Sequence, residues 1–140
     1  MRKGILISLI AAVLTMGAFV FVLQAGSKSK GKAATVEGTL VDSKCYSMGA
    51  FLTDAHTVKG KKMPGCATAC ASMGIPVAIV DEDENVHILA VPAQEYAKWM
   101  ASEIRVKGMY GKHADVLIPQ KLEIKEDGKW VEKELPGTMM

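Results

Sequence analysis

The sequence predicts a small, mainly β domain that follows an N-terminal export segment. Short apolar runs with many β-branched residues recur along residues 35–135, and turn residues separate them, as in all-β domains. Two short segments with helix signals interrupt these runs. With 140 residues, the chain has room for one domain and not for two.

Residues 1–25 have the layout of a secretory signal peptide or a transmembrane anchor helix. Arg2 and Lys3 precede an uncharged, apolar stretch over residues 4–23, and small residues follow up to Ala25. About 20 apolar residues are also enough to cross a bilayer, so cleavage after Ala25 and retention as an anchor both stay open. Either outcome predicts an exported domain, periplasmic or anchored in the inner membrane and facing the periplasm.

A domain of residues 35–135 is expected between two less ordered segments. Residues 26–34 are rich in Ser, Gly and Lys, which is typical of a flexible tether, and residues 136–140 predict a loose tail. Residues 36–140 carry 12 basic and 15 acidic side chains. This balance argues against a nucleic-acid partner, because such a partner would need a basic surface.

The first half of the domain is a strand, a long loop and a short helix. Residues 35–42 predict the strand through their β-branched and apolar side chains. Residues 44–63 predict a loop, and a loop of this length in a small domain is more often functional than not. Residues 65–73 predict the helix, because they are rich in alanine, Pro64 stands at the entry and Gly74 follows the end.

The second half adds a hairpin, a helix and further strands. The hairpin turns at an acidic segment, and the helix shows apolar side chains at three- and four-residue spacing. The predicted bounds are residues 76–80 and 86–91 for the hairpin, 92–101 for the helix, and 103–110, 115–125 and 130–133 for the later strands.

The order of these elements is the plan of a small OB-like barrel. A strand is followed by a Cys-bearing insert of a loop and a short helix, then by two strands, one further helix and two more strands. In the OB-fold, a helix joins the third and fourth strands of a five-stranded, partly open barrel. Another small α+β sandwich is the alternative arrangement.

Three cysteines form the most informative group in the sequence. Cys45 follows the first strand, while Cys66 and Cys70 are four residues apart on one face of the predicted helix. The Cβ atoms of Cys66 and Cys70 would be roughly 5–6 Å apart, whereas a disulfide needs a Cβ–Cβ distance of about 3.5–4.5 Å. One interpretation is a disulfide from Cys45 to Cys66 or Cys70, which leaves one thiol over. The other is a site that holds a soft metal ion or carries out thiol redox chemistry.

Two further side chains are candidate metal ligands. Met63 stands three residues before Cys66, and His56 lies in the long loop. Thiolates with a thioether suit Cu(I), whereas three cysteines with a histidine suit Zn²⁺. The sequence carries no phosphate-binding Gly-rich loop, no GxSxG and no HExxH, so an enzymatic role is not the expectation.

The segments GTLVDSKCY and GCATACASMGIPVAIV resemble a family of uncharacterised exported bacterial proteins with OB-like domains. That family has a strand ending in Cys-Tyr, a loop, and then His-x-x-Cys-Ala-x-x-Cys-Ala-x-x-Gly-x-Pro. The chain departs from it at one point, where Met63 takes the place of the histidine. The resemblance implies a functional cysteine cluster and implies no activity. The matching residues are Cys45, Tyr46, Cys66, Ala67, Cys70, Ala71, Gly74 and Pro76.

The sequence therefore predicts an exported accessory domain that binds a soft metal ion, or carries out thiol redox work, through its three cysteines. The alternative is a disulfide-stapled binding module. In that case the loop at residues 44–63, with Tyr46 and Phe51, would recognise a protein or a glycan, as the loops of OB barrels do.

Overall fold

The computed structural model describes residues 31–137 of the chain. The predicted signal or anchor at residues 1–25, residues 26–30 of the tether and the last three residues of the tail lie outside this part. Within it, no helix has both the length and the apolar character that crossing a bilayer requires. In chain order the elements are β1 (Ala33–Asp42), α2 (Ser43–Ser47), β2 (His56–Val58), β3 (Lys61–Met63), α3 (Cys66–Ser72), β4 (Val77–Val80), β5 (Val86–Ile88), α4 (Ala93–Tyr96), η1 (Ala97–Trp99), β6 (Glu103–Tyr110), β7 (Leu117–Glu126) and β8 (Lys129–Lys133).

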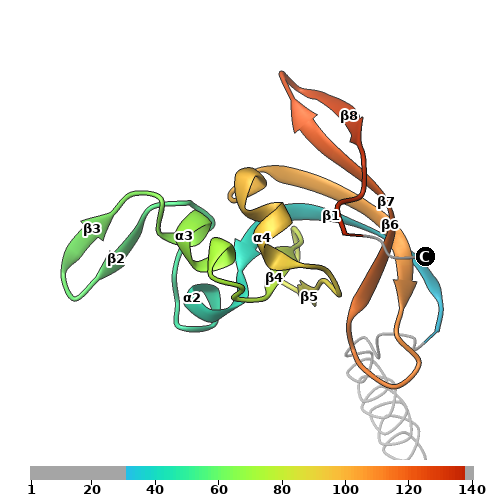
Figure 1. The fold of residues 1–140 in the computed structure, drawn as a ribbon, viewed down its shortest axis with the longest axis horizontal. Coiled ribbons are helices and arrows are strands. Elements are labelled where there is room, and N and C mark those ends of the chain that lie inside the picture. The colour runs from blue at the N-terminus through green and yellow to red at the C-terminus, as the bar shows by residue number, and fades with distance from the viewer. Residues whose placement is uncertain (1–30, 138–140) are drawn as a thin grey trace, which may run out of the picture.

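Six antiparallel strands form the main sheet, in the order β5-β4-β1-β6-β7-β8 (Figure 1). The central strand β1 pairs with β6 from Ala33 to Thr39 and with β4 from Thr39 to Asp42. Its last residues therefore lead from the middle of the sheet directly into α2. The mainly β fold class predicted from the sequence is confirmed.

The main sheet is open, because β5 and β8 are its two edges. An isolated parallel bridge joins Leu89, just after β5, to Leu117 at the start of β7, and the amide of Ala90 donates to the carbonyl of Leu117 at 2.9 Å. The ring of His87 on β5 also hydrogen-bonds to the hydroxyl of Tyr110 on β6. In the described residues these contacts join the two halves of the sheet, and no continuous ladder closes it into the predicted barrel.

Two glycines allow neighbouring strands to approach closely. A Cβ atom at Gly38 would lie 2.1 Å from the carbonyl oxygen of Val80, and one at Gly108 would lie 2.1 Å from that of Ile118. The β6–β7 ladder also shifts its register between Lys107 and Gly108. Any side chain at these two positions would push backbone apart, so the sheet needs glycine there.

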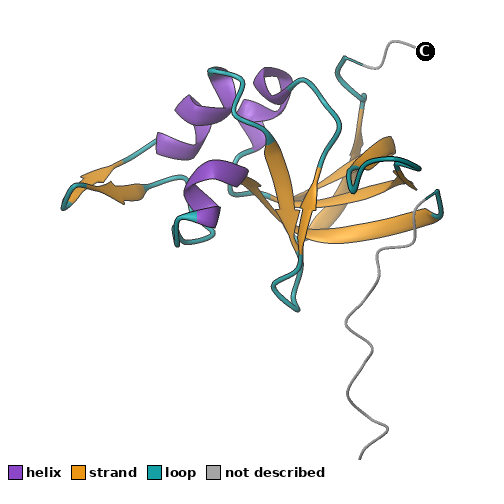
Figure 2. Ribbon diagram, turned by 90° about the horizontal axis from the view of Figure 1, so that it is seen from below, coloured by secondary structure: helices purple, strands orange, loops and turns teal. Residues whose placement is uncertain are grey.

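The core lies between the main sheet and a layer of short helices, which gather on one side of it (Figure 2). Ala67 and Ala71 of α3 are buried in this core beside Tyr96 of α4. Because they are four residues apart, they form one face of α3. Each follows a cysteine directly, so the packing of the alanine face fixes the direction in which Cys66 and Cys70 point.

The predicted loop at residues 44–63 contains regular structure. It opens with α2 and closes with the β2–β3 hairpin, which projects from one end of the molecule (Figures 1 and 2). The hairpin turns at Lys59 and Gly60, whose φ angles of 49° and 76° suit a tight primed turn. With one buried residue between them, these two strands show too little apolar pattern to be predicted. At the other boundary, β1 begins at Ala33, inside the predicted tether.

Candidate metal centre

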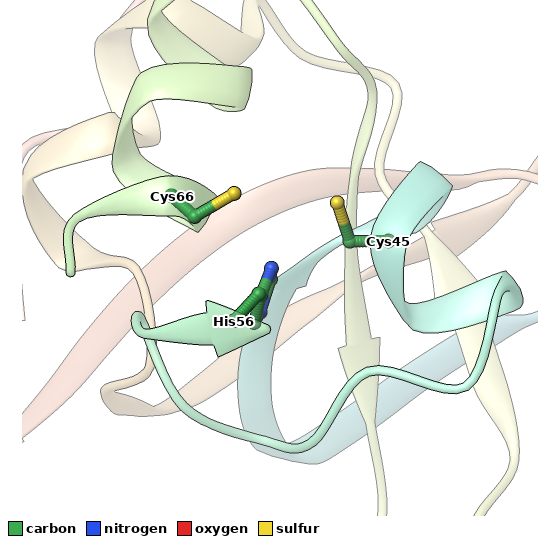
Figure 3. A group of neighbouring side chains, drawn as sticks. All are labelled: Cys45, His56 and Cys66. Atoms are coloured by element: carbon green, nitrogen blue, oxygen red, sulfur yellow. The ribbon is translucent and has the colours of Figure 1, made fainter. Parts of the chain in front are cut away.

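Three side chains from separate elements meet at one point. Cys45 comes from α2, His56 from β2 and Cys66 from α3, and their ligand atoms all lie within 4.8 Å of one another. Figure 3 shows the three side chains turned toward a common space. The predicted convergence of Cys45 with the cysteines of the helix is therefore confirmed, and His56 lies with them.

The third cysteine belongs to an overlapping group. Cys70 lies one turn after Cys66 on α3, and its sulfur is within 4.8 Å of both the Cys45 sulfur and a carboxylate oxygen of Asp42. Cys45 is thus common to the two groups. Together they bring three thiols, one imidazole and one carboxylate into the same region.

Two aspartates hold the elements that carry the cysteines. Asp42 is the N-cap of α2, and its Oδ1 accepts a hydrogen bond of 2.8 Å from the amide of Cys45. Asp54 binds the start of α3, where its Oδ1 accepts a hydrogen bond of 2.8 Å from the amide of Thr68. Its carbonyl also accepts one of 3.2 Å from the amide of Ala67. The end of β1 therefore positions α2, and the loop positions the start of α3.

Asp42 also faces the histidine. Its Oδ2 lies 3.8 Å from Nδ1 of His56, and both side chains are buried. Neither of these two atoms has a hydrogen-bond partner among the described residues. Buried polar atoms without partners are rare and destabilising in folded proteins. A metal ion bound to Nε2 of His56 would direct Nδ1–H toward Oδ2, so that the two atoms could pair with each other.

The surroundings of Cys45 and Cys70 favour the protonated thiol when no metal ion is bound. Burial raises the pKa of the Cys45 thiol to about 12, and the neighbouring Asp42 carboxylate adds to the shift. Burial, followed by the charge of Asp42, also raises the pKa of Cys70. Redox-active and nucleophilic cysteines need a lowered pKa. These environments therefore favour metal binding, in which the ion itself displaces the thiol proton, over thiol redox chemistry.

The other predicted site residues lie around this centre. Met63 pairs with His56 across the β2–β3 hairpin, which places both side chains on the same face, and 43% of Met63 is exposed. Tyr46 is half-buried and packs against the small apolar cluster around Val41. Phe51 lies on the surface of the loop.

Sequence reasoning missed Asp42 and Asp54 as parts of the centre. Asp42 ends a predicted strand, where it reads as an ordinary polar residue. Its position three residues before Cys45 is that of an N-cap, but the helix that it caps has only five residues. Asp54 acts on α3 across fourteen residues of chain, and no local sequence pattern reports such a contact.

A comparison of the chain with protein-family models, with curated proteins and with solved structures found no match.

Proposed function

We propose that this chain is an exported accessory domain that holds one soft metal ion through Cys45, His56 and Cys66, with Cys70 as the fourth ligand. The observation that carries the proposal is the convergence of donor atoms from α2, β2 and α3 within 4.8 Å. Residues from three separate elements meet here, so the cluster is a feature of the tertiary fold.

The spacing of the donors suits metal coordination. Three atoms that are mutually within 4.8 Å have a central point no farther than about 2.8 Å from each of them, whereas zinc–ligand bonds are about 2.0–2.3 Å. An inward movement of about half an ångström for each sulfur, and of somewhat more for the imidazole nitrogen, would therefore bring these three donors to bonding distance.

Zinc is the ion that this donor set favours. Three cysteines and one histidine are a common tetrahedral set for Zn²⁺. Asp42 then has a supporting role, because its Oδ2 can accept a hydrogen bond from Nδ1 of His56 and leave Nε2 for the metal ion. Cu(I) is the competing ion, and Met63, beside His56 on the hairpin, would be its additional ligand.

The remaining parts of the proposal are the export route and the barrel. The N-terminal segment Gly4–Leu23 has the composition of a signal or an anchor, and the resemblance to exported OB-like proteins agrees with it. The strand order and the parallel bridge between Leu89 and Leu117 support an OB-like barrel closed by short contacts. In this arrangement the metal centre lies at the end of the central strand.

Metal analysis of the full chain tests the proposal. Protein purified from the periplasm should contain one zinc ion per chain, and removal of the ion by a chelator should release three free thiols. Native mass spectrometry before and after reduction reports metal content, disulfides and cleavage together. A protein without metal that holds one stable disulfide and one inert thiol would overturn the proposal.

Substitutions connect the metal to the named donors. His56→Ala and Cys66→Ser should each lower the zinc affinity by at least about tenfold. His113→Ala is the matched control, because His113 is exposed and far along the chain. Reconstitution with Co²⁺ provides a second readout, since tetrahedral thiolate ligation gives a characteristic visible spectrum that should change in Cys66→Ser and persist in His113→Ala.

A further inference from the structure

A pocket of about 330 Å³ opens directly in front of the metal centre. Two of the donors, Cys45 and His56, belong to its lining, so an occupant of the pocket would contact the centre itself. Pockets for small molecules are concave, largely apolar and carry a few polar groups that orient the ligand. The lining residues are Cys45, Met48, Gly49, Ala50, Phe51, His56, Thr57, Val58 and Lys59.

The walls of this pocket are apolar side chains that face water. Phe51 is 82% exposed, Met48 70% and Val58 44%. A single exposed apolar residue needs no explanation, but several around one concavity mark a binding surface. Phe51 and Met48 come from the loop after α2, and Val58 comes from β2, so the walls belong to two different segments of the chain.

The pocket lining includes one lysine. Lys59 lines the pocket, and Lys61 and Lys62 follow it on the same hairpin. The acidic residue of the loop, Asp54, is engaged with the start of α3 through the amide of Thr68. The apolar walls thus meet the cation of Lys59, which complements a ligand with an apolar body and a negative charge.

We infer that this pocket binds a small organic anion with an apolar body. The apolar part lies between Phe51, Met48 and Val58, and the charged group pairs with Lys59. The volume is that of a small-molecule site. This ligand therefore differs from the protein or glycan that the sequence predicts as the alternative ligand of the loop at residues 44–63. Binding does not require the metal ion, but an occupant would shield Cys45 and His56 from solvent.

Two fluorescent probes with the same aromatic framework test the inference. One is the anion 8-anilinonaphthalene-1-sulfonate, and the other is the neutral N-phenyl-1-naphthylamine. The full chain should bind one anionic probe with higher affinity than the neutral one, and decanoate should displace both. Phe51→Ser and Val58→Ser should weaken binding of both probes by about fivefold or more, since each removes apolar contact area.

The lysine separates the two probes. Lys59→Gln should lower the affinity for the anionic probe by about twofold to fivefold, the range for an exposed ion pair. It should leave the affinity for the neutral probe unchanged. Lys112→Gln, at an exposed lysine between β6 and β7, and Ile118→Ser, at a β7 residue that is 42% exposed, are the controls and should change neither affinity. Equal effects of Val58→Ser and Ile118→Ser, or of Lys59→Gln and Lys112→Gln, would overturn the inference.

Separate control experiments test whether the substitutions affect folding and whether probe binding depends on the metal ion. Urea unfolding midpoints of Phe51→Ser, Val58→Ser and Lys59→Gln should match the unchanged chain, because all three side chains are exposed. Probe binding should persist in Cys66→Ser, whose cysteine is a proposed metal ligand outside the pocket lining, and in chelator-treated protein. If the chain holds no metal and still binds the probe as described, only the proposed function fails. If the chain holds zinc and the pocket substitutions leave the probe affinity unchanged, only this inference fails.

Discussion

Asp42 has two roles at the scale of single residues. One oxygen of its carboxylate caps the helix that carries Cys45, and the other faces His56 at 3.8 Å. A single buried side chain therefore caps the helix of a thiol and lies beside an imidazole. Groups that orient metal ligands in this way affect affinity without touching the ion.

Asp42→Asn separates these two roles. Asparagine keeps an oxygen that can cap α2, so the free energy of unfolding should fall by less than about 1 kcal/mol. The other oxygen becomes an amide nitrogen, which cannot accept a hydrogen bond from His56, and the zinc affinity should fall by about 10- to 100-fold. Competition with a chromophoric chelator measures the affinity.

Asp54→Asn is the matched control for that experiment. It likewise keeps an oxygen for its helix, where the amide of Thr68 donates, and Asp54 has no described contact with His56. Its zinc affinity should stay within about twofold of the unchanged chain. Equal affinities of Asp42→Asn and Asp54→Asn would show that Asp42 acts only as a cap.

The raised pKa values of two thiols predict how metal binding depends on pH. The pKa of Cys45 is raised to about 12 and that of Cys70 is raised in the same direction, so both sulfurs carry protons across the neutral range. A metal ion must displace these protons, which means that acid opposes binding. The zinc affinity should rise by at least about tenfold per pH unit between pH 6 and pH 8. An affinity independent of pH in this range would exclude Cys45 as a ligand.

At the scale of elements, a substitution of Gly38 tests how closely β1 must approach β4. In Gly38→Ala the added methyl group would lie 2.1 Å from the Val80 carbonyl, so backbone has to move. The free energy of unfolding should fall by about 3 kcal/mol. Urea denaturation followed by circular dichroism gives this value.

Gly49→Ala provides the comparison. Gly49 has a φ of +88° and nothing near its missing Cβ, so alanine meets only the strain of the left-handed conformation, about 1 kcal/mol. A larger loss for Gly49→Ala than for Gly38→Ala would contradict the argument from close approach.

The elements that the sequence predicts well are those with strong local signals. The helix with Cys66 and Cys70 follows from its alanines and from Pro64 and Gly74 at its ends, and the long strands follow from their β-branched residues. The β2–β3 hairpin has no such signal, because only one of its six strand residues is buried. The burial of His56 depends on that hairpin, so the sequence could present it only as a candidate ligand.

At the scale of the whole molecule, a buried network joins β5 to β6. The ring of His87 contacts the Tyr110 hydroxyl through Nδ1 and the Asp81 carboxylate through Nε2, the latter at 2.9 Å. Tyr110→Phe removes one of these hydrogen bonds and should lower the free energy of unfolding by about 1 kcal/mol. Met109→Leu, at the exposed neighbouring position, is the control and should leave the midpoint of urea unfolding unchanged.

The same network predicts how stability depends on acid. Burial raises the pKa of Asp81, but the hydrogen bonds from His87 and Asn85 outweigh it, and the net pKa lies below the ordinary value of 3.8. A carboxyl group with a lowered pKa stabilises the fold at pH values above its ordinary pKa. This contribution is lost as the pH falls through the lowered pKa. The thermal midpoint of the unchanged chain should therefore decline below about pH 4 more steeply than that of Asp81→Asn. Parallel declines would assign the acid sensitivity to other carboxyl groups.

The β2–β3 hairpin has a consequence for how fast an ion leaves the centre. In the described residues its strands pair only with each other, whereas Cys45 follows the central strand and Cys66 sits on a helix packed in the core. His56 is then the donor on the least anchored element, and swinging the hairpin outward would detach it alone. Metal release would be a hinge event, and amide exchange in residues 56–63 should slow when the ion binds.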